Sequence, residues 1–273
     1  MPSPITPRSL QTLLRSVSSS RAFASSFEVS PDPTHLNLDY APPSYDAHSA
    51  AVYPNFITEE ESKSIIKEVS KRMKRRRFEQ GHWDSVIVGY REVELVIPND
   101  LPSDSSTSNS DKDSPPLFVN AIRRTRKHLE AKHLTHSESI RWIPCHAIDL
   151  SADGRLDAHV DSIKFSGDIV AGISLLSDSI MRLKPCSEEW KSSDANHTAS
   201  SSLQVEGHVD LYLPKLSLYV LAGMSRFTYT HELLPSGSMF EFTNAESKIE
   251  GVRVDRGRRL SVIFRDELRT EKK

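Results

Sequence analysis

Two stretches of the chain carry side chains that together could bind a metal ion. The segment RLDAHVDSIKF holds His159 and Asp161, and the segment FTYTHEL holds His231. If the first segment is a strand, residues two apart lie on one face, about 7 Å from each other. Two imidazoles and one carboxylate form the 2-His-1-carboxylate facial triad, which binds Fe(II) and leaves coordination positions open. A zinc site would favour cysteine, and neither of the two cysteines is suitably placed in the sequence.

Such a triad would support oxygen chemistry. Three protein ligands on one face of an octahedral Fe(II) leave three positions free. A 2-oxo acid can fill two of them through its keto and carboxylate oxygens, and dioxygen can take the third. The chain contains 11 histidines, so two ordinary alternatives stand beside this one. His159 could face solvent at a strand edge, and His231 could be a hydrogen-bonded core residue.

The last strand-like segment, RRLSVIFRDE, predicts a partner for the 2-oxo acid. With a period of two, one face carries Arg259, Ser261, Ile263 and Arg265. The opposite, core-facing side carries Leu260, Val262 and Phe264. The first face should then point two guanidinium groups into the interior of the fold, where arginine is costly unless it is paired. A dicarboxylate would pair with them through two parallel hydrogen bonds. The alternative is that both arginines face water beside local acids.

Two further side chains are candidates for supporting roles. Tyr219, in LSLYVLAG, could donate its hydroxyl to the same carboxylate, or it could be an ordinary core tyrosine. His146, in PCHAIDL, could stand behind the metal ligands near the cosubstrate, or it could lie on the surface. We expect no role for Cys145 beside it.

Two amphipathic helices are expected ahead of most strands. Residues 58–78 (TEEESKSIIKEVSKRMKRRRF) predict a helix with Thr58 as its N-cap and Glu61 completing a capping box. Residues 116–134 (PLFVNAIRRTRKHLEAKHL) predict the second helix. The cations of Lys71–Arg77 suit the C-terminal end of a helix dipole. They could instead form a patch for RNA or acidic lipid.

About eight short strand-like runs follow, from CHAIDLS at residue 145 to RRLSVIFRD. Turn-forming residues separate these runs, and a further strand is predicted over 84–98. Two polar, low-complexity stretches near 98–116 and 186–206 are expected to be flexible insertions. The pattern predicts a mainly β fold with flanking helices, an antiparallel sandwich or jelly roll, in one domain over 28–273.

The first 27 residues have the composition of a targeting segment. They contain many serines, no acidic residue, and the cations Arg8, Arg15 and Arg21. One helical face, spaced i, i+3, i+4, i+7, is formed by Leu10, Leu13, Leu14 and Val17. This pattern is typical of a mitochondrial transit peptide, and a disordered tail is the alternative. Its removal would leave a chain three charges more negative than the formal −2 of the whole sequence.

Composition also limits the partners of the chain. A net charge of −2 gives no overall attraction to nucleic acid or membranes. No apolar run approaches the roughly 18 residues of a membrane span, so no transmembrane segment is expected. Two cysteines cannot make a disulfide framework, and a reducing compartment is the simpler interpretation. We expect a monomer.

Taken together, these motifs resemble the AlkB family of Fe(II)/2-oxoglutarate dioxygenases. The likeness rests on a His-X-Asp pair, a distant His and a last strand similar to R-x-N-x-T-x-R, with Ser and Ile in the Asn and Thr positions. In this sequence these residues are His159, Asp161, His231, Arg259, Ser261, Ile263 and Arg265. The local text VDSIKF, AGISLLS, SLYVL, THE and RGRRLSVI looks closest to the mitochondrial branch. The likeness covers roughly residues 35–268.

The resemblance implies a double-stranded β-helix fold, Fe(II), and 2-oxoglutarate as cosubstrate with O2. The metal would be held by His159, Asp161 and His231. By position, 2-oxoglutarate would be contacted by Tyr219, Arg259, Ser261 and Arg265. The resemblance also implies a mitochondrial matrix location, release of succinate and CO2, and links to fatty-acid metabolism and regulated necrotic cell death.

Three departures from the family pattern bear on the substrate. The gap before the last strand is longer than the family usually shows, with an insertion over 232–256. Members that act on nucleic acids carry Asn-x-Tyr where this chain has His146-Ala-Ile. After Trp142, no aromatic residue precedes His159 to stack a flipped base. The acids of this approach, which would repel phosphates, are Asp149, Asp153 and Asp157.

We therefore expect the substrate to be a protein side chain or a small molecule, and we expect duplex DNA not to be one. The alternative is a demethylase of single-stranded RNA that binds phosphates through Lys71–Arg77. A third hypothesis is a jelly roll used only for interaction. The intact ligand set argues against that hypothesis.

Overall fold

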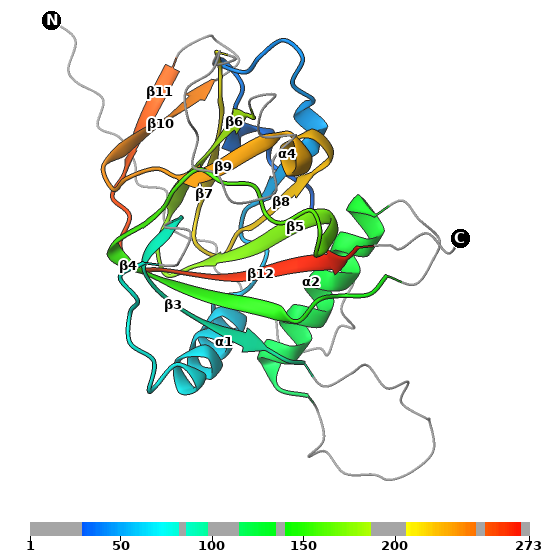
Figure 1. The fold of residues 1–273 in the computed structure, drawn as a ribbon, viewed down its shortest axis with the longest axis vertical. Helices are drawn as coiled ribbons and strands as arrows, with labels where there is room; N and C mark the ends of the chain where they lie inside the picture. The colour runs from blue at the N-terminus through cyan, green and yellow to red at the C-terminus, as the bar shows by residue number, and fades with distance from the viewer. Residues whose placement is uncertain are drawn as a thin grey trace, which may run out of the picture.

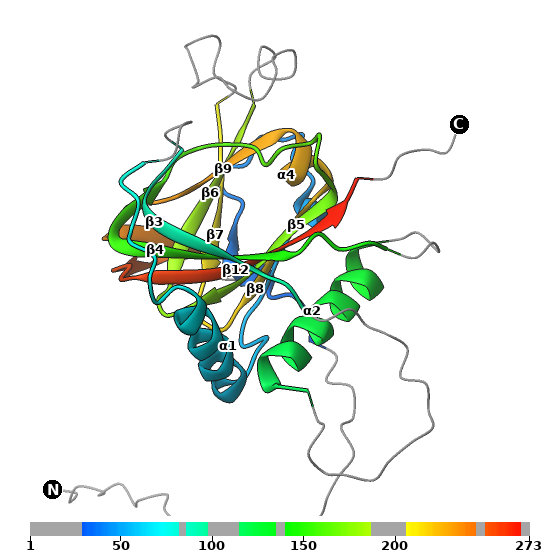
Figure 2. The same ribbon diagram turned by 60° about the horizontal axis from the view of Figure 1, so that its bottom comes forward.

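The computed structural model describes residues 29–81, 86–97, 115–134, 140–186, 206–243 and 249–268. The predicted transit peptide lies outside the described residues, and so do most of the two predicted insertions. Two antiparallel sheets face each other, and two helices cover the outer side of the larger sheet (Figure 1, Figure 2). The functional site lies between the sheets.

Six strands form the larger sheet. In spatial order they are β2 (Ala50–Tyr53), β8 (Leu218–Ala222), β5 (Ser166–Leu175), β12 (Arg259–Glu267), β4 (Cys145–Leu156) and β3 (Ile87–Leu95). The smaller sheet contains, in order, β1 (Leu36–Asn37), β7 (Val209–Leu213), β6 (Ser179–Pro185) and β9 (Tyr229–Leu233). All pairings are antiparallel, and several join strands far apart in sequence. The predicted double-stranded β-helix, or jelly roll, with flanking helices is therefore confirmed.

Helices α1 (Glu59–Arg72) and α2 (Leu117–His133) lie next to each other on the outer side of the larger sheet (Figure 2). The predicted capping box opens α1. The Thr58 hydroxyl accepts from the N–H of Glu61 at 3.1 Å, and the Glu61 carboxylate accepts from the N–H of Thr58 at 2.9 Å. The helix ends at Arg72, earlier than predicted, so the last cations of the basic segment follow it outside the helix.

Two apolar layers result from the alternation of side chains along the strands. On β12, Leu260, Val262 and Phe264 pack beneath the helices with apolar side chains of α1 and α2. The alternate residues, from Arg259 to Arg265, line the space between the two sheets. The two faces predicted for this strand are confirmed, because the period of two carries one set to each side of the sheet.

The insertion before the last strand forms a β-hairpin of its own. Strands β10 (Ser238–Thr243) and β11 (Ile249–Val254) pair with each other outside both sheets (Figure 1). Phe240 and Val254 of this hairpin pack against Ile180 of β6 in a small separate cluster. The short elements are η1 (Pro33–His35), η2 (Ala47–Ser49) and α4 (Gly223–Phe227). No helix among the described residues is long and apolar enough to cross a membrane.

The chain leading to the metal-binding motif differs from the prediction. The sequence predicts two strands here, CHAIDLS and RLDAHVDSI, with the His-X-Asp motif on the second. The structure has one strand, β4, which runs on to Leu156 and then leaves the sheet. His159 and Asp161 therefore lie in an irregular segment between β4 and β5, and the prediction that they share a strand face is wrong.

Long-range contacts explain why β4 continues through SADG, a sequence with turn signals. Gly154 lies so close to β3 that a Cβ on it would come within 2.8 Å of the Gly89 carbonyl oxygen. The buried side chain of Arg256 donates to the carbonyls of Ser151 and Gly154. Partners far away in sequence thus satisfy the backbone of this stretch and hold it in the sheet.

Candidate active site

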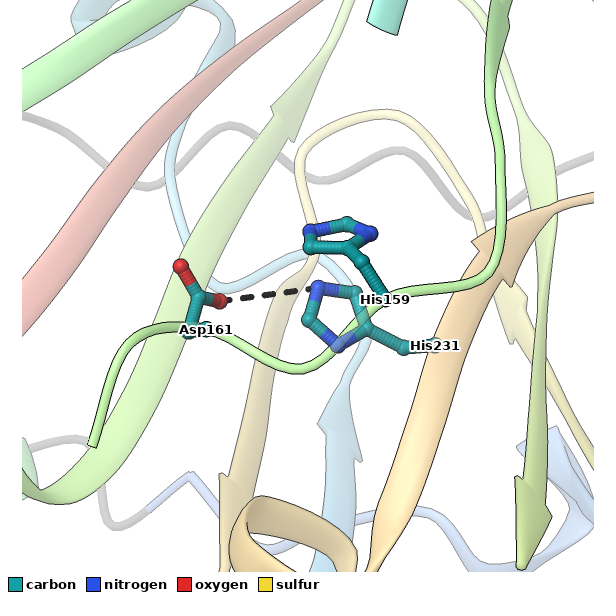
Figure 3. A group of neighbouring side chains, drawn as sticks. All are labelled: His159, Asp161 and His231. Carbon is teal, nitrogen blue, oxygen red and sulfur yellow. Dashed lines mark ion pairs between the residues drawn. The ribbon is translucent and has the colours of Figure 1, made fainter. Parts of the chain in front are cut away.

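The three predicted metal ligands come together in space (Figure 3). Their ligand atoms all lie within 4.8 Å of one another. Nε2 of His231 is 3.5 Å from Oδ2 of Asp161, and the rings of His159 and His231 are 4.1 Å apart between centroids. His231 comes from β9, and the other two come from the segment that joins β4 to β5.

Backbone hydrogen bonds fix the two histidines against each other. The N–H of His159 donates to the carbonyl of His231 at 3.1 Å, and the reverse bond is 2.8 Å long. Nδ1 of His159 lies 2.9 Å from the backbone oxygen of Asp157. Because a carbonyl can only accept, Nδ1 carries the proton of the neutral ring. Nε2 then keeps the lone pair that a metal needs.

Arg265 holds the carboxylate of Asp161. Its Nε and one terminal nitrogen both donate to Oδ1, at 3.0 and 2.5 Å. Burial alone would raise the pKa of Asp161, but the Arg265 guanidinium and the two imidazoles keep it well below its usual range. The carboxylate is therefore ionised at neutral pH. Its other oxygen, Oδ2, is the one directed at His231.

His231 is held in its neutral form. Burial, reinforced by the neighbouring His159, lowers its pKa to about 3, although the Asp161 carboxylate acts in the opposite direction. A neutral imidazole is the form that binds a metal. The fold thus prepares two ligands for a metal, because the Arg265 contact keeps Asp161 charged and burial keeps His231 uncharged.

A pocket between the sheets contains these ligands. Its polar lining consists of His159, Asp161, Tyr219, His231, Arg259, Ser261 and Arg265. Its apolar lining is aliphatic and consists of Ile87, Ile148, Leu150, Leu156, Val170, Met181, Leu233 and Ile263. All three predicted metal ligands and all four predicted 2-oxoglutarate residues therefore line one pocket.

Arg259 brings an unpaired charge into this pocket. It is 4% exposed, and its Nε and one terminal nitrogen have no acceptor among the described residues. Burial lowers its pKa, while a hydrogen bond with Tyr219 acts in the opposite direction. A buried guanidinium with two free donors destabilises the fold unless a ligand satisfies it. A carboxylate fits, because it accepts two parallel hydrogen bonds from one guanidinium.

Tyr219 depends on a glycine on the neighbouring strand. Gly172 of β5 lies directly opposite Tyr219 of β8, and a Cβ on Gly172 would come within 2.5–2.6 Å of the tyrosine ring and hydroxyl. The missing side chain makes room for the ring against β5, and the hydroxyl bonds to Arg259. Ser261, which is 2% exposed, lines the same pocket.

Two polar residues of β4 have partners outside the pocket lining. Nδ1 of the half-buried His146 is 3.8 Å from Oε2 of Glu92 on β3, and His146 does not line the pocket. Asp149 is 1% exposed, and its carboxylate accepts from Arg91 at 2.8 Å and from Arg258 at 2.7 and 2.8 Å. The expectation that Asp149 repels phosphates at the approach is therefore wrong, because its charge is buried and paired.

Sequence reasoning missed one residue that contacts the metal-binding segment. Arg226 of α4 is 2% exposed and donates to the backbone oxygen of Asp161 at 2.9 Å. Its local sequence, GMSRF, carries no recognised motif. Only its position five residues before His231 links it to the site.

The donor set fits the groups that the chemistry predicts. Two imidazoles with free lone pairs and one ionised carboxylate match the ligands of a facial-triad Fe(II) site. The free donors of Arg259 match the carboxylate of a 2-oxo dicarboxylic acid. Both groups would lie in one pocket.

Comparison with solved structures gives low similarity in sequence and in shape. A structure of OsALKBH1 is 17% identical with a TM-score of 0.44, over 80% of this chain and 97% of that chain. A Pseudomonas putida prolyl-4-hydroxylase is 11% identical with a TM-score of 0.45, over 81% of this chain and 94% of that chain. No family model matches the chain.

Comparison with curated proteins gives a much higher similarity. The Mus musculus protein named alpha-ketoglutarate-dependent dioxygenase alkB homolog 7, mitochondrial, is 32% identical over 216 residues, which are 79% of this chain and 77% of that protein. The Bos taurus protein of the same name is 32% identical over 219 residues, 80% of this chain and 78% of that protein. The chain therefore belongs to the AlkB homolog 7 family and is an Fe(II)- and 2-oxoglutarate-dependent dioxygenase.

Proposed function

We propose a division of roles among the pocket residues. Fe(II) would be held by His159, Asp161 and His231. The 5-carboxylate of 2-oxoglutarate would be bound by Arg259, with help from Tyr219 and Ser261. Arg265 would support the chelating end from behind Asp161. The observation that carries the cosubstrate assignment is the pair of unpartnered donors on the buried Arg259.

When bound, Fe(II) with 2-oxoglutarate and dioxygen supplies the oxidation of a substrate C–H bond, and succinate and CO2 are released. The chain prepares the site for this chemistry. Arg265 keeps Asp161 ionised and occupies one of its oxygens. Burial keeps His231 neutral. Aliphatic side chains such as Leu156 and Leu233 give the rest of the pocket an apolar lining.

The substrate is proposed to be a protein side chain or a small molecule. Once the polar lining is assigned to metal and cosubstrate, the remaining lining in the described part of the pocket is aliphatic. Reading a nucleobase requires hydrogen bonds to its edge and stacking between aromatic or apolar side chains. Apart from the two histidines and Tyr219, whose hydroxyl bonds to Arg259, the described lining has no aromatic ring. A polypeptide or metabolite can enter such a pocket without being extruded from a duplex.

The substrate class is tested by comparing active protein with an Asp161→Ala variant. Matrix proteins, metabolites and methylated oligonucleotides, single- and double-stranded, would be incubated with each and analysed by mass spectrometry. We expect oxidised peptides or metabolites that depend on Asp161, and no turnover of methylated duplex DNA. Efficient, Asp161-dependent repair of methylated duplex DNA would overturn this ranking.

A single-stranded RNA demethylase is the second candidate. The cations of Lys71–Arg77 are exposed at the end of α1 and beyond it, where they could contact phosphates. Of these, Arg72 is paired with Glu68 at 2.7 Å and also donates to the backbone oxygen of Glu94. In the experiment above, Asp161-dependent loss of methyl groups from single-stranded RNA alone would favour this candidate.

We further propose that residues 28–273 form a single, monomeric dioxygenase domain in the mitochondrial matrix. The support is the acid-free amphipathic start of the sequence and the word mitochondrial in the names of both curated relatives. The links to fatty-acid metabolism and regulated necrosis are proposed from the family resemblance.

We expect residues 1–30 fused to a fluorescent protein to enter mitochondria, because an arginine-rich amphipathic segment without acids is typical of imported proteins. Microscopy and fractionation measure the import. A matched fusion in which Arg8, Arg15 and Arg21 are replaced by glutamate should remain in the cytosol. Cytosolic fluorescence from the unaltered fusion would disprove the targeting proposal.

A further inference from the structure

The metal ligand Asp161 sits on a piece of chain that secondary structure does not hold. Strand β4 ends at Leu156 and β5 begins at Ser166. Within this segment, the only ladder contact among the described residues is the bridge between His159 and His231. The five residues from Asp161 to the start of β5 therefore need support from side chains elsewhere.

Arg226 supplies that support. One terminal nitrogen donates to the Asp161 carbonyl at 2.9 Å. The other donates to the Ser162 carbonyl at 3.1 Å and to the Ser166 hydroxyl at 2.7 Å. Ser166 in turn donates from its hydroxyl to the Ser162 carbonyl at 2.9 Å. One guanidinium thus ties together both ends of the turn that follows the metal ligand.

Arg226 is itself fixed by its element. It belongs to α4, which joins β8 to β9 and so leads directly to His231. The neighbouring Ser225 anchors α4, because its hydroxyl is 2.7 Å from that of Ser49 and 2.9 Å from that of Tyr45. Arg226 therefore connects the segment that carries His159 and Asp161 to the segment that carries His231.

We infer that Arg226 is a positioning residue that sets the Asp161 turn in register with His231 before the metal binds. This inference rests on the proposed metal site. The planar fork of arginine suits the task, since two nitrogens reach three acceptors at once, which a lysine ammonium cannot reproduce in the same geometry. Residues that orient metal ligands from behind typically change metal affinity by about 10- to 100-fold when they are replaced.

Arg256 offers a matched control. Like Arg226 it is buried, at 6% against 2% exposure, and its Nε also lacks a partner among the described residues. It too donates to two backbone carbonyls, those of Ser151 and Gly154 in β4. Among the described residues it makes no contact with the segments that carry the proposed metal ligands. Replacing Arg256 therefore removes a buried guanidinium and its hydrogen bonds to backbone carbonyls at a place away from the metal site.

The experiment titrates Mn(II) into four proteins and monitors binding by calorimetry and electron paramagnetic resonance. The four are the unaltered protein, Arg226→Gln, Arg226→Lys and Arg256→Gln. We expect about 10- to 100-fold weaker Mn(II) binding and an altered resonance spectrum for Arg226→Gln, and an intermediate loss for Arg226→Lys. Arg256→Gln should lower the melting temperature about as much as Arg226→Gln does, but its Mn(II) affinity and resonance spectrum should be those of the unaltered protein.

Each outcome decides one question. If Arg226→Gln binds Mn(II) as tightly as Arg256→Gln, the positioning role is wrong. If Arg226→Gln does not fold, Arg226→Lys decides, and unaltered affinity and spectrum in that variant overturn the inference. The unaltered protein should bind Mn(II), and His231→Ala should abolish that binding. If the unaltered protein binds no Mn(II), or if His231→Ala binds it equally well, the proposed metal site is wrong and the inference fails with it.

Discussion

A protein in which Asp161 is replaced by alanine is expected to lose stoichiometric iron and to form no succinate from 2-oxoglutarate. The substitution removes the one carboxylate of the ligand set and leaves the half-buried Arg265 without its partner. Two imidazoles alone hold Fe(II) weakly, because the triad requires a carboxylate. Iron content after anaerobic reconstitution and succinate release by mass spectrometry measure the two effects.

The matched control is Asp157→Asn, which removes a carboxylate from the same segment. That side chain is exposed and pairs only with Arg155 among the described residues, while its backbone oxygen still accepts from His159. We expect normal iron content and normal succinate release. His231→Ala should behave like Asp161→Ala. Normal iron content and succinate release in His231→Ala would remove the assignment of the ligand set.

Replacing Arg259 by alanine is expected to weaken 2-oxoglutarate binding by about 10- to 150-fold, since a charge-assisted bidentate contact contributes roughly 1.5–3 kcal/mol. The reason is that Arg259 alone offers two buried, unpartnered donors on the described pocket wall. Calorimetry with the Mn(II)-loaded protein measures this affinity without turnover. Mn(II) affinity itself should stay unchanged, because Arg259 bonds to Tyr219 and not to a metal ligand.

Arg253→Ala is the control for this measurement. Arg253 lies on the exposed hairpin strand β11 and pairs with Asp255 at 2.9 Å. The Arg253→Ala protein should bind 2-oxoglutarate with the affinity of the unaltered protein. An Arg259→Ala protein with that same affinity would rule out Arg259 as the anchor of the 5-carboxylate.

Local rules predicted those parts of the site that depend on local periodicity. The pattern of β12 required only that alternate side chains point to opposite faces, and this holds for any strand. Arg259 and Arg265 were therefore predicted to face the interior, and the structure has them there. The start of α1 was predicted in the same way, because Thr58 and Glu61 interact within one turn.

Contacts between distant segments decided the features that local rules missed. The turn-like sequence SADG stays in β4 because Gly154 packs against β3 and Arg256 binds its carbonyl. Asp149 is not a surface acid, because it is paired with Arg91 of β3 and with Arg258, which directly precedes β12. The role of Arg226 likewise depends on how α4 meets the start of β5. None of these pairings is visible within a short window of sequence.

The contact between Arg265 and Asp161 would also determine how many oxygens of Asp161 a metal ion could bind. Both donors of Arg265 converge on Oδ1, so this oxygen is already occupied, and Oδ2 is the oxygen that lies 3.5 Å from Nε2 of His231. Asp161 would then bind a metal ion through one oxygen and not through both. A chelating carboxylate would fill a fourth of the six octahedral positions and leave too few for a bidentate 2-oxo acid and dioxygen together. By occupying one oxygen of Asp161, Arg265 would leave a coordination position of the bound metal free for dioxygen.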